Sequence, residues 1–269
     1  RDVIRQSVVD LMASVRVLRE GDWSAVRALP GLESLSFASP PLGFVGISLG
    51  GIVGTIFVAT EPEIEAAVLN VTGGDLTRLV ERSAGFSGLF LPLLLPRLGV
   101  DLAAIGPGDS PSFFPELAIY QTLLDRGDSI AFAPVLAGQP KHLLFQEAEH
   151  DETLPNSSTE ALARGAGAPI VDVEPAFTDL ARATTPLSAN VEVASVRLTR
   201  GLYRFSPATH GLLTWRHDTQ TQVQPVEPPF PETAPRDVDN PVDEALAQAV
   251  HFLDSWRSGS AEIIRPTGP

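Results

Sequence analysis

The chain has 269 residues, of which 43% are hydrophobic and 19% charged, a composition that indicates a folded globular protein. Its formal net charge of −14 argues against nucleic-acid binding, which needs a basic surface. Without cysteine it can form neither a disulfide framework nor a thiolate metal site, and no uninterrupted apolar run reaches the roughly 20 residues that span a bilayer.

The first segment predicts an amphipathic helix. Apolar residues recur at helical spacing from Val3 to Leu18, and Gly21 follows the pattern. The sequence opens inside this helix, with neither an initiator methionine nor a signal-peptide pattern, so we expect it to be the later part of a longer polypeptide. A linker from Pro30 to Pro41 leads to the next element.

The next stretch predicts a strand, a sharp turn and a helix. The strand is the apolar run from Pro41 to Ile47, and the helix is the glycine-spaced apolar run from Leu49 to Ala59. The turn between them is Gly46-Ile47-Ser48-Leu49-Gly50, which matches the nucleophile-elbow pattern G-x-S-x-G.

The chemistry of an elbow explains these residue types. A serine at a strained turn, here Ser48, presents its hydroxyl clear of the backbone, and flanking glycines avoid Cβ collisions with the strand and the helix. The amide of Leu49, at the helix N-terminus, would point to the place where an oxyanion forms. The alternative is a glycine-rich turn whose serine has no catalytic role.

A second buried strand is predicted from Ala66 to Val71, closed by Gly73 and Gly74. Strand, helix and strand in this order form a right-handed crossover unit. The sequence therefore predicts an α/β protein with a mostly parallel sheet flanked by helices.

Residues 75–118 differ from the rest. The run from Phe86 to Pro96 is very apolar, but prolines interrupt it and it is too short to span a membrane. Two interpretations stay open: a helical insert packed on the body of the protein, or a lid, meaning a mobile apolar cover over the site.

The middle of the chain predicts three elements. A helix is expected from Glu116 to Gly127 and a third strand from Lys141 to Glu147. After an acidic loop, Ser157 or Ser158 is expected to cap a helix from Thr159 to Arg164.

The remaining segment is less regular. Residues 190–198 predict a fourth strand or a hairpin near a sheet edge, residues 205–211 a loop, and residues 219–237 an extended surface connection rich in proline.

The closing helix is expected to begin with Asn240 as N-cap and Pro241 in the first helical position, and to run to Trp256. The chain shows no internal repeat and no sharp domain boundary. We therefore expect one catalytic domain over residues 1–269, with the lid-like insert 75–118 inside it.

A serine nucleophile needs a base within hydrogen-bond reach and an acid that orients the base. In the chain order serine, acid, histidine, the best base is His210, which stands before Gly211 in a loop after the last predicted strand. The other four histidines fit less well. His142 begins a predicted strand and His150 stands beside the candidate acid, while His217 lies in a polar segment and His251 inside the closing helix.

The best acid is Asp151. It follows the C-terminal end of the third predicted strand, where catalytic groups gather in open α/β sheets. Its near rivals are Glu147, Glu149 and Glu152, and the alternative is a solvated acidic loop.

Metal sites have weak support. His150-Asp151-Glu152 offers ligand atoms without the spacing of a known cage, and Asp237-x-Asp239-Asn240 lacks the glycine and the distal glutamate of an EF-hand loop. Helix capping explains the second group better. We expect no metal and no cofactor.

With elbow, acid and histidine in this order, the chain resembles an α/β-hydrolase. More narrowly, it is similar to the carboxyl-terminal part of large bacterial extracellular lipases and esterases, the bacterial virulence-factor lipase group. Ile47 stands where many lipases have histidine. Three motifs carry the resemblance: Arg5-Gln6-x-x-x-Asp10-Leu11, Gly46-Ile47-Ser48-Leu49-Gly50-Gly51-Ile52-x-Gly54 and Asp151-Glu152-x-Leu154-Pro155-Asn156.

The resemblance also implies missing parts. Several strands precede the elbow strand in that fold, whereas a single predicted helix precedes it here, and the loop that gives relatives their second oxyanion amide is absent. We therefore expect N-terminal strands to be missing, leaving an exposed sheet edge, and a possible companion N-terminal fragment of the same precursor. The resemblance further implies a secreted or cell-envelope location.

These features predict a serine hydrolase that cleaves carboxylic esters with hydrophobic or acyl groups, as an esterase or lipase does. Ser48 is the predicted nucleophile, His210 the base, Asp151 the orienting acid, and the Leu49 amide one oxyanion donor. Two alternatives stay open: a non-catalytic binding module with the same fold, and a peptidase or acyltransferase that uses the same triad.

Overall fold

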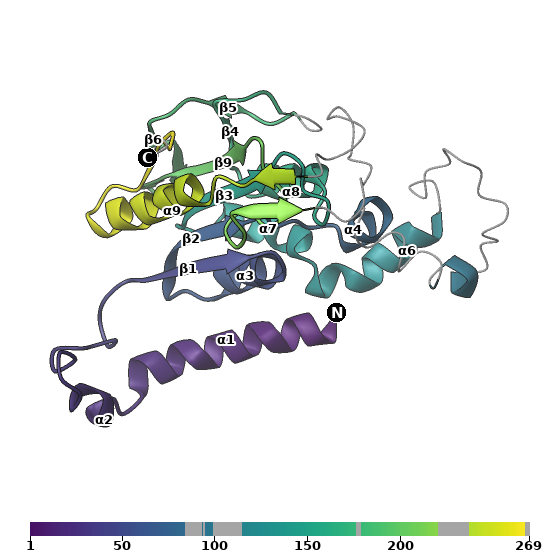
Figure 1. Ribbon diagram of the computed structural model, residues 1–269. Helices are drawn as coiled ribbons and strands as arrows, with labels where there is room; N and C mark the ends of the chain where they lie inside the picture. Colours follow the sequence, from purple (N-terminus) through teal and green to yellow (C-terminus); the bar gives the residue numbers. More distant parts are fainter. Residues whose placement is uncertain (84–92, 94, 99–114, 176–178, 220–236, 267–269) are drawn as a thin grey trace.

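Figure 1 shows a computed structural model of the chain, which describes residues 1–83, 93, 95–98, 115–175, 179–219 and 237–266. Its centre is a sheet whose described strands are all parallel and follow the order β1-β2-β3-β9-β4-β5. In chain order these strands are β1 (Leu42–Ile47), β2 (Ile64–Asn70), β3 (His142–Ala148), β4 (Ile170–Val171), β5 (Arg182–Ala183) and β9 (Arg200–Phe205). The predicted α/β class with a parallel sheet is confirmed.

Helices cover both faces of the sheet. Four of them share a hydrophobic core with one face: α1 (Asp2–Glu20), α3 (Leu49–Thr60), α7 (Ser129–Ala137) and α8 (Asn156–Gly165). Helix α9 (Val242–Arg257) packs on the other face, as the ribbon also shows (Figure 1).

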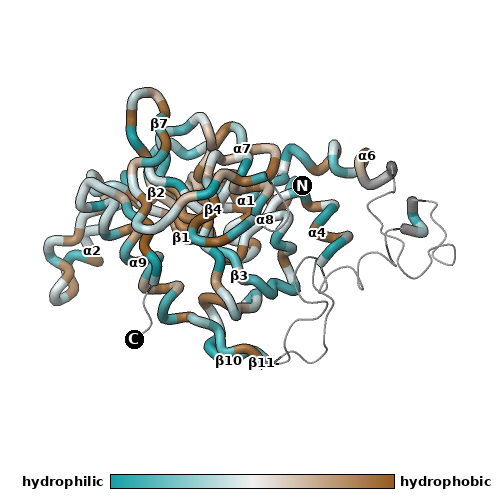
Figure 2. The backbone as a smooth tube through the Cα atoms, turned by 90° about the horizontal axis from the view of Figure 1, so that it is seen from above, coloured by the Kyte–Doolittle hydropathy of each residue, from teal (hydrophilic) through white to brown (hydrophobic). Residues whose placement is uncertain are grey.

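The pleat of the strands divides the core between the two faces. Along β2, Ala67 and Leu69 join the core of α3, whereas Ala66 and Val68 join that of α9. Hydrophobic segments accordingly gather at the centre of the molecule, around β1, β2 and β4 (Figure 2). No described helix is both long and apolar enough to cross a membrane.

The other described elements are short and lie around this centre. They are α2 (Ser24–Arg27), α4 (Leu76–Arg82), the 3-10 turns η1 (Leu95–Leu98) and η4 (Asp125–Gly127), α6 (Pro115–Leu124), the hairpin β7 (Val191–Val193) and β8 (Val196–Leu198), and the pairs β6 (Leu187–Ser188) with β12 (Glu262–Ile263) and β10 (His217–Thr219) with β11 (Asp237–Asp239). Residues 190–198 thus form a hairpin outside the main sheet, one of the two predicted possibilities.

Strand β9 was not predicted, although it lies next to β3 in the sheet. Its sequence, Arg-Gly-Leu-Tyr-Arg-Phe, has no apolar run. Arg200 is nevertheless only 1% exposed, because its guanidinium donates to five main-chain carbonyls in and just after α7 and α8. Arg204 is buried in ion pairs with Glu147 and Glu160.

The predicted insert, residues 75–118, is described only in part. The described portions are α4, η1, residue 93 and the start of α6. Most of the apolar run 86–96 lies outside the described residues, and its role as a lid remains a prediction. The helix expected over 116–127 ends at Leu124 and continues as the turn η4.

Strand β1, which carries the elbow, lies at one edge of the sheet. Within the described part of the chain it pairs with β2 alone, and Val45 on it is 49% exposed. This order agrees with the expectation of an exposed sheet edge beside the elbow strand.

Candidate active site

Ser48 occupies a strained turn between β1 and α3. Its backbone has φ 54° and ψ −122°, a positive φ that side-chain-bearing residues rarely adopt. The Ser48 amide donates to the carbonyl of Asn70 on β2 at 3.0 Å, and its carbonyl accepts from the amide of Gly51 at 2.8 Å. The parallel sheet and the first turn of α3 thus hold the strained residue from both sides.

The glycines around Ser48 are required to different degrees. A Cβ on Gly46 would lie 2.4 Å from the carbonyl oxygen of Gly50, and one on Gly51 would lie 2.6 Å from Thr72. A Cβ on Gly50 would meet nothing within 4 Å. The predicted steric reason therefore holds for Gly46 but is wrong for Gly50, whereas Gly51 supplies the close approach of α3 to the loop after β2.

The structure brings the three predicted site residues together. Nε2 of His210 lies 2.8 Å from Oγ of Ser48, and Nδ1 lies 2.8 and 3.0 Å from the two carboxylate oxygens of Asp151. The side chains of His210 and Asp151 are 14% and 3% exposed. A hydroxyl, an imidazole and a carboxylate thus form one hydrogen-bonded chain, although the sequence separates Ser48 from His210 by 162 positions.

Main-chain amides fix the Asp151 carboxylate in the loop after β3. Its Oδ1 accepts hydrogen bonds from the amides of Thr153 at 2.9 Å and Leu154 at 2.7 Å. The rival acids are engaged elsewhere. Glu147 pairs with Arg204, and the Glu149 carboxylate accepts from the hydroxyl of Ser206.

Glu152 supports the site from beside it. Its Oε2 accepts the main-chain amide of His210 at 3.3 Å, so it binds the backbone of the base and not the ring. Burial raises the pKa of Glu152, and the neighbouring Asp151 charge raises it further.

The other histidines have different partners among the described residues. The ring of His142 accepts from the amide of Thr199, His150 lies 3.6 Å from the Glu149 carboxylate, and His217 and His251 pair with Asp239 and Glu262. None of these four is bonded to a serine hydroxyl in any described contact.

Asn240 holds the loop that carries His210, a role that the sequence did not reveal. Its Oδ1 accepts the amide of Thr209 at 2.8 Å, and its Nδ2 donates to the carbonyl of Trp215 at 3.0 Å. The predicted N-cap role of Asn240 is wrong, because α9 begins at Val242 with Pro241 as N-cap and no side-chain cap. An Asn-Pro pair before a helix is typical of an N-cap. Only the structure shows that the side-chain amide of Asn240 binds the loop that carries His210.

Ser158, one of the two serines predicted to cap α8, likewise makes another contact. Helix α8 begins at Asn156, and the hydroxyl of Ser158 donates to the carbonyl of Gly74 and accepts its amide. The predicted cap is therefore wrong. Ser158 instead ties α8 to the loop after β2, beside the elbow helix.

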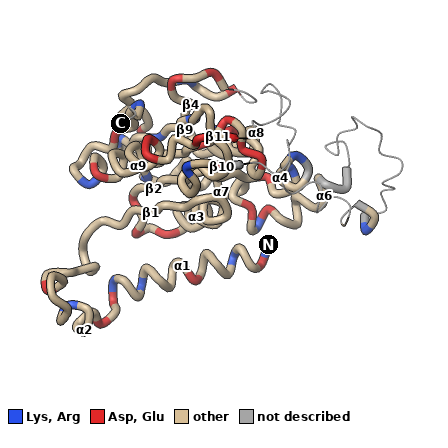
Figure 3. The backbone as a smooth tube through the Cα atoms, in the orientation of Figure 1, with Lys and Arg blue, Asp and Glu red and all other residues tan. Residues whose placement is uncertain are grey.

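The charge around His210 favours its protonated form. Burial lowers the pKa of His210, but the Asp151 carboxylate, with smaller contributions from Glu152 and Asp218, more than offsets this and leaves the pKa above its ordinary value. Figure 3 shows acidic residues gathered where α8, β10 and β11 meet the ends of the sheet strands. An imidazolium that forms at this position is stabilised by its surroundings.

The amide of Leu49 is the first of helix α3, and the first amides of a helix have no acceptor within it. It follows Ser48 directly, at the positive end of the helix dipole. The arrangement can therefore place one hydrogen-bond donor and a partial positive charge beside the Ser48 hydroxyl.

An apolar cavity of about 360 Å³ opens beside Ser48. Its walls come from the start of α3, from α4, from the end of α6 and from the loop after Asp151. In this loop Thr153 and Leu154 both line the cavity and donate their amides to the Asp151 carboxylate, so the same loop borders the cavity and holds Asp151.

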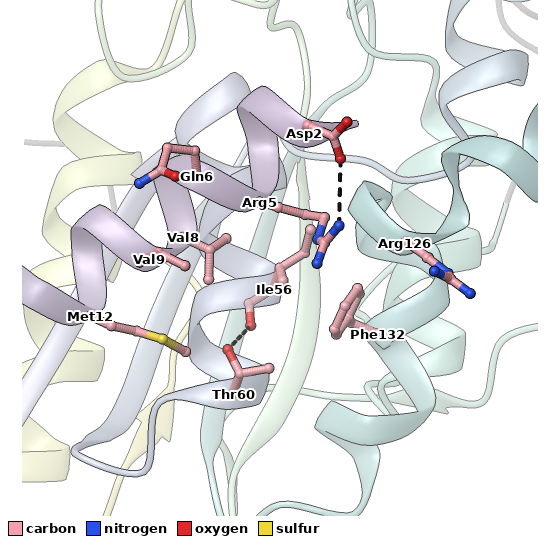
Figure 4. Close-up of a pocket in the computed structure, with 10 residues that line it drawn as sticks. All are labelled: Asp2, Arg5, Gln6, Val8, Val9, Met12, Ile56, Thr60, Arg126 and Phe132. Atoms are coloured by element: carbon pink, nitrogen blue, oxygen red, sulfur yellow. Dashed lines mark hydrogen bonds and ion pairs between the residues drawn. The ribbon is translucent and has the colours of Figure 1, made fainter.

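A second hollow, of about 410 Å³, is lined by residues of α1, of the C-terminal half of α3, of η4 and of α7 (Figure 4). Its carboxylate, Asp2, pairs with Arg5, and its hydroxyl, Thr60, donates to the carbonyl of Ile56 in its own helix. The described lining includes no histidine and no second hydroxyl, so it lacks the groups for nucleophilic catalysis. Among the described residues, no cluster of three histidine, aspartate or glutamate side chains could hold a metal ion.

Ser48 thus lies in a strand–elbow–helix unit, Asp151 follows β3 and His210 follows β9, in a sheet whose described strands are all parallel. No protein-family model and no curated protein matches the chain. Solved structures that are similar include a puromycin-hydrolyzing peptidase of Mycobacterium tuberculosis, with 16% identity over 65% of this chain and 19% of that one and a TM-score of 0.37.

Two esterases are similar to a comparable degree. One is from Pyrococcus furiosus, with 13% identity over 76% of this chain and 53% of that one and a TM-score of 0.36. The other is the esterase domain of a Rhodothermus marinus protein, with 16% identity over 76% and 70% and a TM-score of 0.32. The chain spans less than two thirds of the length of the first matched structures, and likenesses this low say nothing of its activity.

Proposed function

We propose that this chain is a serine hydrolase that cleaves carboxylic esters through an acyl-enzyme on Ser48. The observation that carries the proposal is the continuous chain of contacts from Ser48 Oγ through both ring nitrogens of His210 to the Asp151 carboxylate, each of 2.8 to 3.0 Å. A serine hydroxyl gains nucleophilic power only beside such a base, and the base needs an orienting acid.

In the first half of the reaction, Ser48 Oγ attacks the carbonyl carbon of the ester while His210 Nε2 takes the hydroxyl proton. Asp151 keeps the other ring proton on Nδ1 and stabilises the imidazolium that forms. His210 then gives its proton to the leaving alcohol oxygen as the carbon–oxygen bond breaks. In the second half, water adds to the acyl-enzyme by the same steps and releases the carboxylic acid.

The Leu49 amide supplies one hydrogen bond to the oxyanion in this proposal. Removing a single such donor typically costs about 3 kcal/mol of transition-state stabilisation. The amide is main-chain, so the helix start holds it in place without a side chain that must be ordered during the reaction.

A fluorophosphonate probe tests the proposal. We expect it to label Ser48 in the wild-type chain, and neither Ser48→Ala nor His210→Ala to be labelled at a comparable rate. Ser158→Ala serves as the matched serine control, because this hydroxyl binds a main-chain loop and not a histidine. Absence of label on Ser48 in the folded wild-type protein would overturn the proposal.

A substrate panel separates esters from the other acyl substrates. We expect turnover of esters to exceed that of matched amides, and water to compete successfully with added alcohols and amines for the acyl group. Faster amide cleavage would make the chain a peptidase, and dominant transfer to the added acceptors would make it an acyltransferase. The narrower likeness to bacterial virulence-factor lipases, the secreted location and the companion fragment remain predictions.

A further inference from the structure

The apolar cavity beside Ser48 points to one part of the substrate. We infer that it binds the acyl group of the ester, and that it selects apolar acyl chains of medium length. This inference rests on the proposed function and adds the substrate class.

The place of the cavity assigns it to the acyl side. The leaving alcohol must lie against Nε2 of His210, because that nitrogen returns the proton to it. The described lining of the cavity includes Ser48 and Leu49 but not His210. The group that stays on Ser48 after the alcohol departs therefore points into the cavity.

The lining excludes polar acyl groups. Ile52 comes from the elbow helix, while Leu76, Leu79 and Val80 come from α4. Apart from Ser48, the polar residue in the lining is Thr153, and no charged side chain lines the cavity in the described part of the chain. A charged or strongly polar acyl group would lose its hydration here without gaining a partner.

A buried carboxylate fixes the wall that α4 and α6 form. Asp128, fully buried, accepts the amides of Asp75 and Leu76 at the start of α4, at 3.0 and 2.6 Å. It also accepts Nε2 of Gln121 on α6 at 2.8 Å. Leu79 and Leu124, which line the cavity from α4 and α6, are thereby held in place relative to each other. Because this wall is fixed, it limits the length of the acyl chain that the cavity can hold.

The size of the cavity sets that limit. A methylene group occupies about the volume of a water molecule, ~30 Å³, so a cavity of about 360 Å³ holds at most about a dozen such groups. Each methylene that enters should raise kcat/KM about fourfold until the cavity is filled. Chains longer than this extend into solvent and gain nothing more.

A series of p-nitrophenyl esters from acetate to hexadecanoate tests the inference. We expect kcat/KM to rise by on the order of 10³-fold from acetate to octanoate, because six methylenes are added at about fourfold each, and to stop rising by dodecanoate. In Leu79→Phe the added ring occupies the cavity, so the octanoate-to-acetate ratio should fall at least tenfold. Leu246→Phe, at an exposed leucine of α9, is the matched control and should keep the wild-type ratio.

Two further measurements keep the outcomes distinct. Val80→Phe replaces a less buried residue of the same wall and serves if Leu79→Phe does not fold. Alkyl fluorophosphonates of short and medium chain length report the same preference through labelling rates, without turnover. Labelling of Ser48 with no dependence on chain length, or an unchanged ratio in both Phe variants, would overturn the acyl assignment and leave the hydrolase proposal standing. Absence of any labelling would overturn both.

Discussion

Replacing Asp151 by asparagine tests the electrostatic role of the acid while keeping its shape. In the wild type, Oδ1 accepts two main-chain amides, from Thr153 and Leu154, at 2.9 and 2.7 Å. In the asparagine, the side-chain carbonyl oxygen would have to occupy the position of Oδ1, because an NH₂ group there would face the two donating amides of Thr153 and Leu154. The NH₂ group then takes the place of Oδ2, 3.0 Å from Nδ1 of His210, where it opposes the ring proton.

The expected magnitude follows from the charge that is lost. A carboxylate and an imidazolium whose nearest atoms lie about 3 Å apart attract each other by about 5 kcal/mol at an effective dielectric constant of about 20. Removing this attraction from the transition state would lower the rate by nearly 10⁴-fold. The remaining 2.8 Å contact of Nδ1 with the oxygen at Oδ1 retains part of it. We therefore expect Asp151→Asn to lower kcat/KM by about 10³-fold.

The assay is steady-state hydrolysis of a p-nitrophenyl ester over a range of pH. Because Asp151 is the group that raises the pKa of His210 most, the acid limb of the profile should also move to lower pH in the variant. Asp254→Asn, on the exposed side of α9, is the matched control and should match the wild type. A kcat/KM within tenfold of the wild type, in a folded Asp151→Asn protein, would refute this account of the acid.

Three more predictions concern neighbouring groups. Glu152→Gln removes a charge that raises the pKa of His210, so the acid limb of kcat/KM should shift to lower pH while the plateau changes less than in Asp151→Asn; an unmoved limb would contradict this. Burial raises the pKa of Glu147 to about 7, so its contribution to stability is present below its unfolded value near 4.5 and is lost as pH rises to about 7. Glu147→Gln should flatten this fall in urea unfolding between pH 5 and 8, whereas Glu192→Gln, at an exposed site, should reproduce the wild-type slope. Arg200→Met leaves several buried carbonyls without a donor and should lower the free energy of unfolding by on the order of 4 kcal/mol, measured by denaturant titration, and a loss below about 1 kcal/mol would show that water replaces the guanidinium.

The sequence predicted the elbow well because every requirement of the elbow is local. The apolar strand, the turn at Ser48 and the helix after it lie within twenty consecutive residues, and the collision that demands Gly46 involves Gly50. The chain order limited the candidate base and acid to a few histidines and carboxylates, and the structure brings two of them, His210 and Asp151, to Ser48, although β9, the strand before His210, was not predicted. Their chemical role is what the labelling and kinetic experiments decide.

What the sequence could not show depends on contacts between distant segments. Strand β9 contains two arginines that the sequence pattern alone would place on a surface. Carbonyl groups in α7 and just after α8 accept hydrogen bonds from one, and carboxylates of β3 and α8 pair with the other. Asn240 and Ser158 follow patterns typical of helix caps, but their side chains bind loops that the fold brings to them. The type of a polar side chain tells which hydrogen bonds it can make, but its partner depends on which segments the fold brings close to it.

These distant contacts share one consequence for the site. Two of the loops that carry a site residue are held by a buried polar group: Ser48 by the carbonyl of Asn70, and the His210 loop by Asn240. Asn70 is in turn linked through Gln146 to Gln248 on α9, by bonds of 3.0 Å each. Apolar packing alone would hold the helices against the sheet. It would not fix the orientation of each loop, because apolar contacts have no preferred direction. The 2.8 Å contact between residues 48 and 210 therefore depends on directional bonds made by side chains that never touch a substrate.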